Sequence, residues 1–81
     1  MLMKTIDMRE LVHAKFGEYI RDMRKELNIS QFELAEQLGW SQVYLSYIER
    51  GERDVDFGDA FAICHALGKQ VDDFLKYFNQ K

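Results

Sequence analysis

One stretch of the chain, from Ser30 to Gly51, constrains the fold more than any other. It reads SQFELAEQLGWSQVYLSYIERG. Ser30 and Glu33 have the spacing of a capping box, in which each side chain bonds to the backbone N–H of the other residue, so a helix is predicted to begin here. Gly39 stands where a left-handed residue would end that helix. Ser41 is placed to cap a second helix.

These signals predict two short helices, over residues 31–38 and 42–50. Leu34 and Leu38 share one face of the first helix, and Gly51 ends the second. Two helices joined by a turn of roughly three to four residues that contains Gly form the helix-turn-helix motif. The motif holds its second helix out from the fold, so the outward side chains of that helix are presented to a partner.

A long amphipathic helix is predicted before the motif, over residues 8–27. Its apolar side chains recur at spacings of three and four, which places them on one face; they are Val12, Phe16, Tyr19, Ile20, Met23 and Leu27. Asn28 tolerates the left-handed conformation that would end this helix. Residues 1–6 have no such period, and we expect them to form a frayed extension.

Two more helices are predicted after the motif. Asp56 is placed to cap the first, Gly68 to end it, and its buried stripe is expected to be Phe57, Ala60, Phe61, Cys64 and Leu67. The second runs from Val71 to Phe78, with an apolar face of Val71, Phe74, Leu75 and Phe78. The sequence therefore predicts an all-α fold of five helices in a single domain, residues 1–81.

Charge is the main objection to a nucleic-acid-binding role. The net charge is −3, whereas a DNA-binding domain typically has a basic surface. Residues 30–59 contain Arg50 and Arg53 against a larger set of acids, a local balance of −5: Glu33, Glu36, Glu49, Glu52, Asp54, Asp56 and Asp59. The motif that would touch DNA is therefore locally acidic.

The sequence also indicates the cellular compartment of the protein and argues against catalysis and metal binding. No apolar run approaches the roughly 20 residues that span a bilayer, and the start of the chain does not have the pattern of a secretory signal. A single cysteine, Cys64, fits a reducing compartment. His13 and His65 are far apart with no carboxylate pattern between them, and no catalytic set is found. We therefore expect a cytoplasmic protein that is not an enzyme, has no membrane association and holds no metal or cofactor.

The second helix of the motif has an outward face that suits base edges. With Leu45 and Ile48 turned inward, the outward residues are Gln42, Val43, Ser46, Tyr47 and Arg50. Gln pairs with adenine, Val packs on the thymine methyl group, and Arg forks onto guanine. The alternative is an ordinary solvated helix face. Glu49 falls on the inner shoulder, where a carboxylate is costly unless paired, and Arg24 is its expected partner.

The chain resembles the Cro/C1-type (XRE-like) helix-turn-helix regulators of bacteria and phages. The resemblance covers about residues 16–75. It lies in Arg24, the run Leu27-Asn28-Ile29-Ser30-Gln31, Leu34-Ala35, Leu38-Gly39-Trp40-Ser41, Leu45-Ser46, Ile48-Glu49-Arg50-Gly51, Ala66-Leu67-Gly68 and Val71-Asp72-Asp73-Phe74-Leu75.

The resemblance implies a lambda-repressor-like domain that binds double-stranded DNA as a homodimer, with the second motif helix in the major groove. It implies base contacts from Gln42, Val43, Ser46 and Tyr47, and backbone contacts from Gln31, Tyr44, Arg50 and Arg53. It also implies a structural ion pair between Arg24 and Glu49. A transcriptional regulator is the function expected.

Several residues depart from the family pattern. Val55 replaces a common Pro, Glu52 stands where Lys is frequent, and Lys69 replaces an aliphatic residue. Phe32 and Tyr47 are outward aromatics at positions that are usually polar. Together with the acidic motif, they suggest an alternative: a protein-interaction module of the same fold, such as an antitoxin-like partner of a toxin protein.

Overall fold

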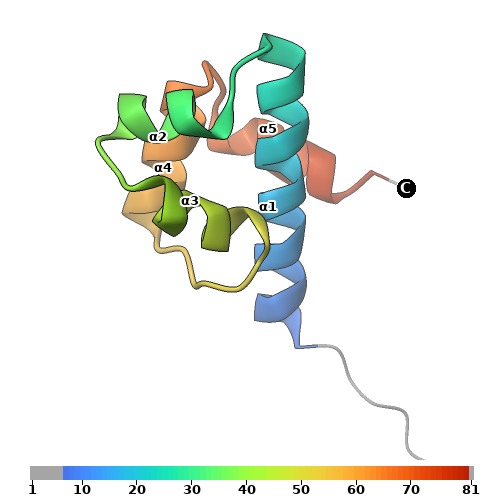
Figure 1. The fold of residues 1–81 in the computed structure, drawn as a ribbon. Coiled ribbons are helices and arrows are strands. Elements are labelled where there is room, and N and C mark those ends of the chain that lie inside the picture. Colours follow the sequence, from blue (N-terminus) through green and yellow to red (C-terminus); the bar gives the residue numbers. More distant parts are fainter. Residues whose placement is uncertain (1–6, 81) are drawn as a thin grey trace, which may run out of the picture.

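The fold consists of five helices in the order that the sequence predicts. A computed structural model describes residues 7–80, and the expected frayed extension at 1–6 lies outside the described residues. The helices are α1 (Met8–Leu27), α2 (Gln31–Leu38), α3 (Gln42–Glu49), α4 (Phe57–Ala66) and α5 (Val71–Phe78). Figure 1 shows the short helices α2, α3 and α4 gathered beside the long helix α1. Between residues 7 and 80 no strand is present, and the all-α prediction is confirmed.

The caps of α2 form as predicted. Ser30 Oγ accepts the N–H of Glu33 at 3.0 Å, and Glu33 Oε1 accepts the N–H of Ser30 at 2.8 Å. Gly39 ends the helix with a φ of 73°, a left-handed conformation that glycine adopts without steric cost. Ser41 Oγ then accepts the N–H of Tyr44 and starts α3. Because all of these contacts are local, they define the turn of the motif independently of tertiary packing.

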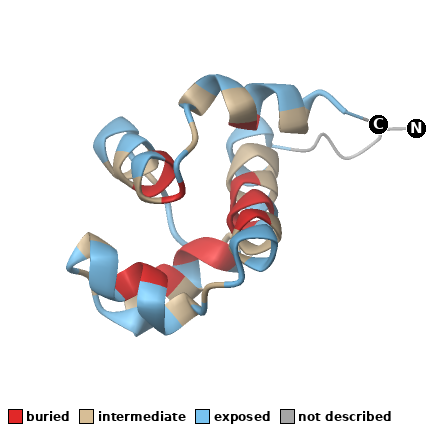
Figure 2. Cartoon of the chain, turned by 90° about the horizontal axis from the view of Figure 1, so that it is seen from above, coloured by how far each residue is buried: buried red, intermediate tan, exposed pale blue. Residues whose placement is uncertain are grey.

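The motif is held in place by a single apolar core. α1 packs against α3 and α5, while α2 packs against α3 and α4. Figure 2 shows that the buried segments of the helices face one another around this centre. The fully buried side chains come from all the helices except α5: Tyr19, Ile20, Leu34, Leu45, Ile48, Ile63 and Cys64. Because Leu45 and Ile48 anchor α3 in this core, the other side of α3 must face outward.

The predicted apolar stripe of α4 is wrong in two places. Phe57 is 84% exposed and Phe61 is 60% exposed. The predicted Cys64 and Leu67 are buried and Ala60 packs against the core, and the buried residue that the prediction missed is Ile63. Phe61 falls at the edge of the buried face of α4, and Phe57, the first residue of α4, is not covered by any of the described helices.

Two other predicted core residues are also exposed. Leu27, in the last turn of α1, is 47% exposed, and Leu75 on α5 is 49% exposed. α1 and α5 therefore each bury a narrower row of apolar side chains than the sequence pattern predicts. On α5 the half-buried Tyr77 packs against the core, with its ring centroid 5.1 Å from that of Tyr19.

Gly17 allows α1 and α3 to approach closely. This residue lies in the middle of α1 and is buried. A Cβ atom added there would meet the backbone carbonyl groups of Glu49 and Ile48, the latter oxygen at 2.8 Å. Since those atoms belong to the backbone of α3, only a shift of a whole helix end would relieve the clash.

We therefore expect Gly17→Ala to lower the free energy of unfolding by about 1–3 kcal/mol, the usual cost of overpacking. Gly58→Ala is the matched control, because its nearest new contact, Asp56 Oδ1, would lie at 3.4 Å. The control should leave stability unchanged or slightly raised. Urea denaturation of both variants checks this, and a Gly17→Ala protein as stable as wild type would rule out the close approach.

Candidate nucleic-acid interface

The outward face of α3 is open to solvent along its length. Val43 is 65% exposed and Tyr47 is 43% exposed, whereas Leu45 and Ile48 beneath them are buried. Gln42 is exposed and Ser46 is half-buried on the same side. Among the described residues, no segment of the chain covers this face. The four side chains proposed from the sequence for base contacts are thus accessible together.

A shallow groove of about 320 Å³ brings these four side chains next to Gln31 and Arg50, two residues that the family resemblance implies for contacts with the DNA backbone. It is lined by Gln31, Gln42, Val43, Ser46, Tyr47 and Arg50. Gln31 is the first residue of α2, so the groove joins the start of α2 to the outward side of α3. Backbone N–H groups at such a helix start favour a negatively charged group such as phosphate.

Glu49 has the partner that the sequence suggests. Its carboxylate is buried, and Arg24 donates to both oxygens, from Nε to Oε2 at 2.8 Å and from Nη2 to Oε1 at 2.9 Å. Arg24 also donates to the carbonyl oxygen of Ile29 at 3.2 Å. Arg21 donates to the backbone carbonyl of Glu49. These contacts fix the end of α3 against α1 and against the start of the motif.

The ion pair continues outward as a chain of hydrogen bonds. Gln31 donates from Nε2 to Glu49 Oε1 at 3.2 Å, and Gln42 donates from Nε2 to Gln31 Oε1 at 3.2 Å. This arrangement orients the amide of Gln42 and leaves its oxygen and its second N–H free to pair with another group. A side chain that is oriented in advance loses less conformational entropy on binding.

Two arginines that follow α3 in the sequence are each held against an aromatic ring. The guanidinium of Arg50 lies 4.8 Å from the ring centroid of Tyr47, and Arg53 lies 4.8 Å from that of Tyr44. Arg50 also pairs with Glu52 at 3.3 Å and donates to Ser46. The acid at position 52 therefore competes with phosphate for Arg50.

Tyr44 is half-buried and serves as a support between α3 and α4. Its hydroxyl donates to Asp59 Oδ2 at 2.7 Å, and this hydrogen bond raises the pKa of Tyr44 because the carboxylate favours the protonated phenol. The ring also packs edge-on against Trp40, with centroids 5.1 Å apart. Because its hydroxyl is already engaged, Tyr44 is placed to position Arg53 more than to reach a phosphate itself.

Several of the acidic side chains in residues 30–59 are directed inward or cap helices. Glu33 belongs to the capping box of α2, and Glu49 is paired with Arg24. Asp56 Oδ1 accepts the N–H of Asp59 at the start of α4, and Asp59 accepts from Tyr44. Of these four carboxylates, Glu49 is neutralised by a cation, and the other three keep their charge but are held toward hydrogen-bond donors in the fold.

His13 and Cys64 have structural roles in the fold. His13 Nε2 accepts the N–H of Val55 at 3.3 Å and thereby ties α1 to the segment between α3 and α4. Cys64 is buried in the core, and burial raises the pKa of its thiol. Among residues 7–80, no group of three or more potential ligands is placed to hold a metal ion. None of the described helices combines the length and apolar character needed to cross a membrane.

Comparison with known proteins gives consistent matches. The family model described as helix-turn-helix matches residues 20–74. The HTH-type transcriptional regulator y4dJ of Sinorhizobium fredii is 36% identical over 78% of this chain and 77% of its own length. The control protein C.BamHI of Bacillus amyloliquefaciens is 35% identical over 86% of this chain and 88% of its own.

A solved structure is similar over most of the chain. The clp gene regulator ClgR from Corynebacterium glutamicum superimposes with a TM-score of 0.79 and 34% sequence identity. The superposition covers 83% of this chain and 86% of that one.

Proposed function

The chain belongs to the helix-turn-helix family of the XRE/Cro-C1 type, and we propose that it reads duplex DNA through the outward face of α3. It is a DNA-binding transcriptional regulator, like the relatives that it matches over most of its length. We propose base contacts from Gln42, Val43, Ser46 and Tyr47, with α3 lying in the major groove.

The observation that carries this proposal is the hydrogen-bond chain from Glu49 through Gln31 to Gln42. It fixes an exposed amide at the leading end of α3 with one donor and one acceptor free. That pair matches N7 and the N6 amino group of adenine in the major groove. Gln31 lies at the start of α2, where the N–H groups of the helix end are suited to a phosphate.

We propose that Arg50 and Arg53 make the contacts with the DNA backbone. Gln31 lies beside them at the start of α2, and Tyr44 lies under the guanidinium of Arg53. Each phosphate that a protein neutralises adds about −0.9 to the slope of log K against log salt on duplex DNA. With few cations near α3, we expect a shallow slope. We further propose that the protein acts without catalysis, in the cytoplasm, and through a single domain whose motif lies at residues 30–51.

The test is selection from a random duplex pool, followed by titration of the selected duplex at several salt concentrations. We expect Arg53→Ala to reduce the magnitude of the salt slope by about 0.9, because one phosphate contact is lost. Lys76→Ala is the matched control, since Lys76 is an exposed cation on α5, and it should leave the slope unchanged. Failure to enrich any duplex at low salt would defeat the proposal.

We propose that two copies of the chain bind together, so that two α3 helices address half-sites about 34 Å apart along the duplex. Such a dimer needs a self-complementary surface. Phe57 and Phe61 lie one turn apart on α4 and are the two most exposed of its large apolar residues. Aromatic side chains are enriched in the centres of protein interfaces, which makes this pair the surface that we assign to the dimer.

Phe61→Glu is expected to convert a dimer to a monomer, because it places a charge in the centre of the two-fold contact. Phe32→Glu is the matched control: Phe32 is also an exposed phenylalanine, at 55%, but it lies on α2. Sedimentation or light scattering measures the mass. A wild-type protein that is monomeric at all concentrations, or a Phe61→Glu protein that stays dimeric, would contradict the assignment.

A further inference from the structure

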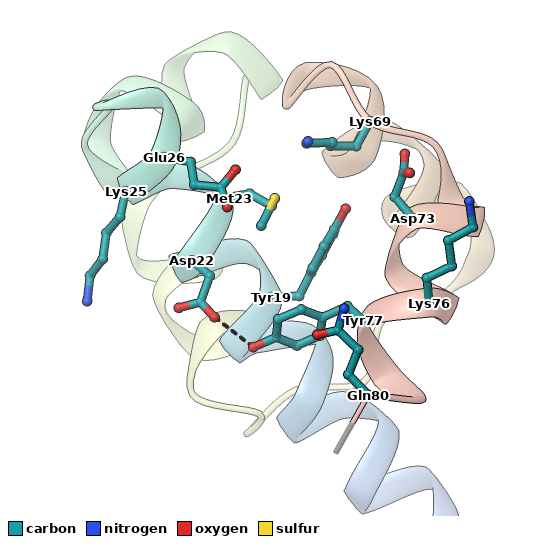
Figure 3. Close-up of a pocket in the computed structure, with 10 residues that line it drawn as sticks. All are labelled: Tyr19, Asp22, Met23, Lys25, Glu26, Lys69, Asp73, Lys76, Tyr77 and Gln80. Atoms are coloured by element: carbon teal, nitrogen blue, oxygen red, sulfur yellow. Dashed lines mark hydrogen bonds between the residues drawn. The ribbon is translucent and has the colours of Figure 1, made fainter.

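A second pocket lies between α1 and the C-terminal part of the fold, and none of the residues assigned to DNA lines it. Its volume is about 530 Å³, within the range of small-molecule sites. α1 contributes Tyr19, Met23 and Glu26, and the chain at and before α5 contributes Lys69 and Asp73. Figure 3 shows these side chains arranged around one hollow.

The floor of this pocket contains a buried hydroxyl without a partner. Tyr19 is 2% exposed, and its ring packs against Phe74 and Tyr77 with centroid distances of 5.5 and 5.1 Å. Its hydroxyl oxygen is buried and has no hydrogen-bond partner among the described residues. The neighbouring Tyr77, in contrast, donates to Asp22 at 2.7 Å. Buried polar groups are nearly always paired, so each exception calls for an explanation.

The Tyr19 hydroxyl is directed into the pocket and is a ready donor. Figure 3 shows it pointing into the space between Met23 on one side and Lys69 and Asp73 on the other. Burial raises the pKa of Tyr19 to about 12, so the proton is present at neutral pH. Met23 and Lys69 are long, unbranched side chains, and a rotamer change in either would admit a ligand group.

Charges of both signs surround this hydroxyl. Figure 3 shows Lys69, Asp73 and Lys76 on one side and Glu26 on the other, and neither lysine nor Glu26 forms an ion pair among the described residues. Asp73 uses one oxygen to accept the N–H of Gln70 at 2.8 Å. A ligand with a single charge would satisfy only one sign of this lining, whereas a zwitterion would satisfy both.

We propose that this pocket binds a small zwitterion of the amino-acid class. The ligand carboxylate accepts from the Tyr19 hydroxyl and from Lys69, and its ammonium group lies against Glu26 on the opposite side of the pocket (Figure 3). The pocket shares a turn of α1 with Arg24, the residue that holds Glu49, so a bound ligand lies next to the support of α3. The proposal goes beyond DNA binding and does not depend on it.

The test uses amide chemical shifts and melting temperature of the full chain. The probes are the free amino acids in small groups, inorganic phosphate, and the diamine putrescine, each at about 10 mM, which detects millimolar binding. We expect one amino-acid group to shift the amides around Tyr19 and Lys69 and to raise the melting temperature, as any ligand selective for the folded state does. Phosphate and putrescine alone should have little effect.

Two variants make the test specific. Tyr19→Phe and Lys69→Met should each weaken amino-acid binding at least about tenfold, a loss of about 1.4 kcal/mol, while the rest of the spectrum stays unchanged. Lys15→Met, a lysine on α1 that pairs with Glu18, is the control and should bind as wild type does. The proposal is overturned if no amino acid binds, if phosphate or putrescine alone gives the same response, or if both variants bind like wild type.

Discussion

Glu49→Ala is expected to lower the free energy of unfolding by about 3–5 kcal/mol, because it leaves the Arg24 guanidinium next to the core without its partner. Glu49 is 3% exposed, and its carboxylate accepts from both Arg24 and Gln31. Denaturant unfolding gives the value directly. For a domain of this size, such a loss corresponds to a fall in melting temperature of well over 10 °C, at roughly 4–8 °C per kcal/mol.

A double-mutant cycle measures the interaction energy between Arg24 and Glu49 apart from their contacts with other residues. Arg24→Ala alone should also be strongly destabilising, and the double variant should cost much less than the sum of the two, since neither charge is then left unpaired. Glu36→Ala is the matched control, an exposed glutamate on α2, expected to change stability by less than about 0.5 kcal/mol. Melting of Glu49→Ala within a degree or so of wild type would show that the pair does not hold α3.

The Gln42→Ala, Tyr47→Ala double variant is expected to lose specific DNA binding while the fold remains intact. Both side chains are exposed and form no part of the core. A good base contact contributes about 1–3 kcal/mol, so the dissociation constant of the selected duplex should rise by on the order of 100-fold. Fluorescence anisotropy measures the affinity, and circular dichroism checks the helix content.

Gln37→Ala is the matched control for this loss, because Gln37 is an exposed glutamine on α2 that does not line the groove of α3. It should bind as wild type does. An unchanged affinity in the double variant would instead favour the alternative hypothesis, a protein-interaction module that uses its exposed aromatic side chains.

Local sequence signals predicted the helices well because caps and turns are short-range. The Ser30–Glu33 box, the Ser41 cap and the left-handed Gly39 each depend on residues within a few positions. The partner of Glu49 could also be predicted, since a carboxylate on the inner shoulder of α3 needs a cation, and Arg24 was the suitable one nearby.

Tertiary features were predicted less well, because helical periodicity does not say which part of an apolar face a neighbour covers. The pattern alone placed Phe57 and Phe61 in the core, where the structure has Ile63. The need for Gly17 appears only when the backbone of α3 is seen against α1. The hydrogen bond between the side chains of Gln31 and Gln42 could not be predicted, because the spacing of these two residues does not form a recognisable sequence pattern.

The most direct test of the central claim is to map the protein surface that meets DNA, by recording amide chemical shifts during titration with the selected duplex. If α3 reads the duplex, the largest changes will lie in residues 42–47 and at the start of α2 around Gln31, with small changes in α5. Changes confined to α4 and α5, with residues 42–47 unaffected, would contradict the assignment of α3 as the reading helix.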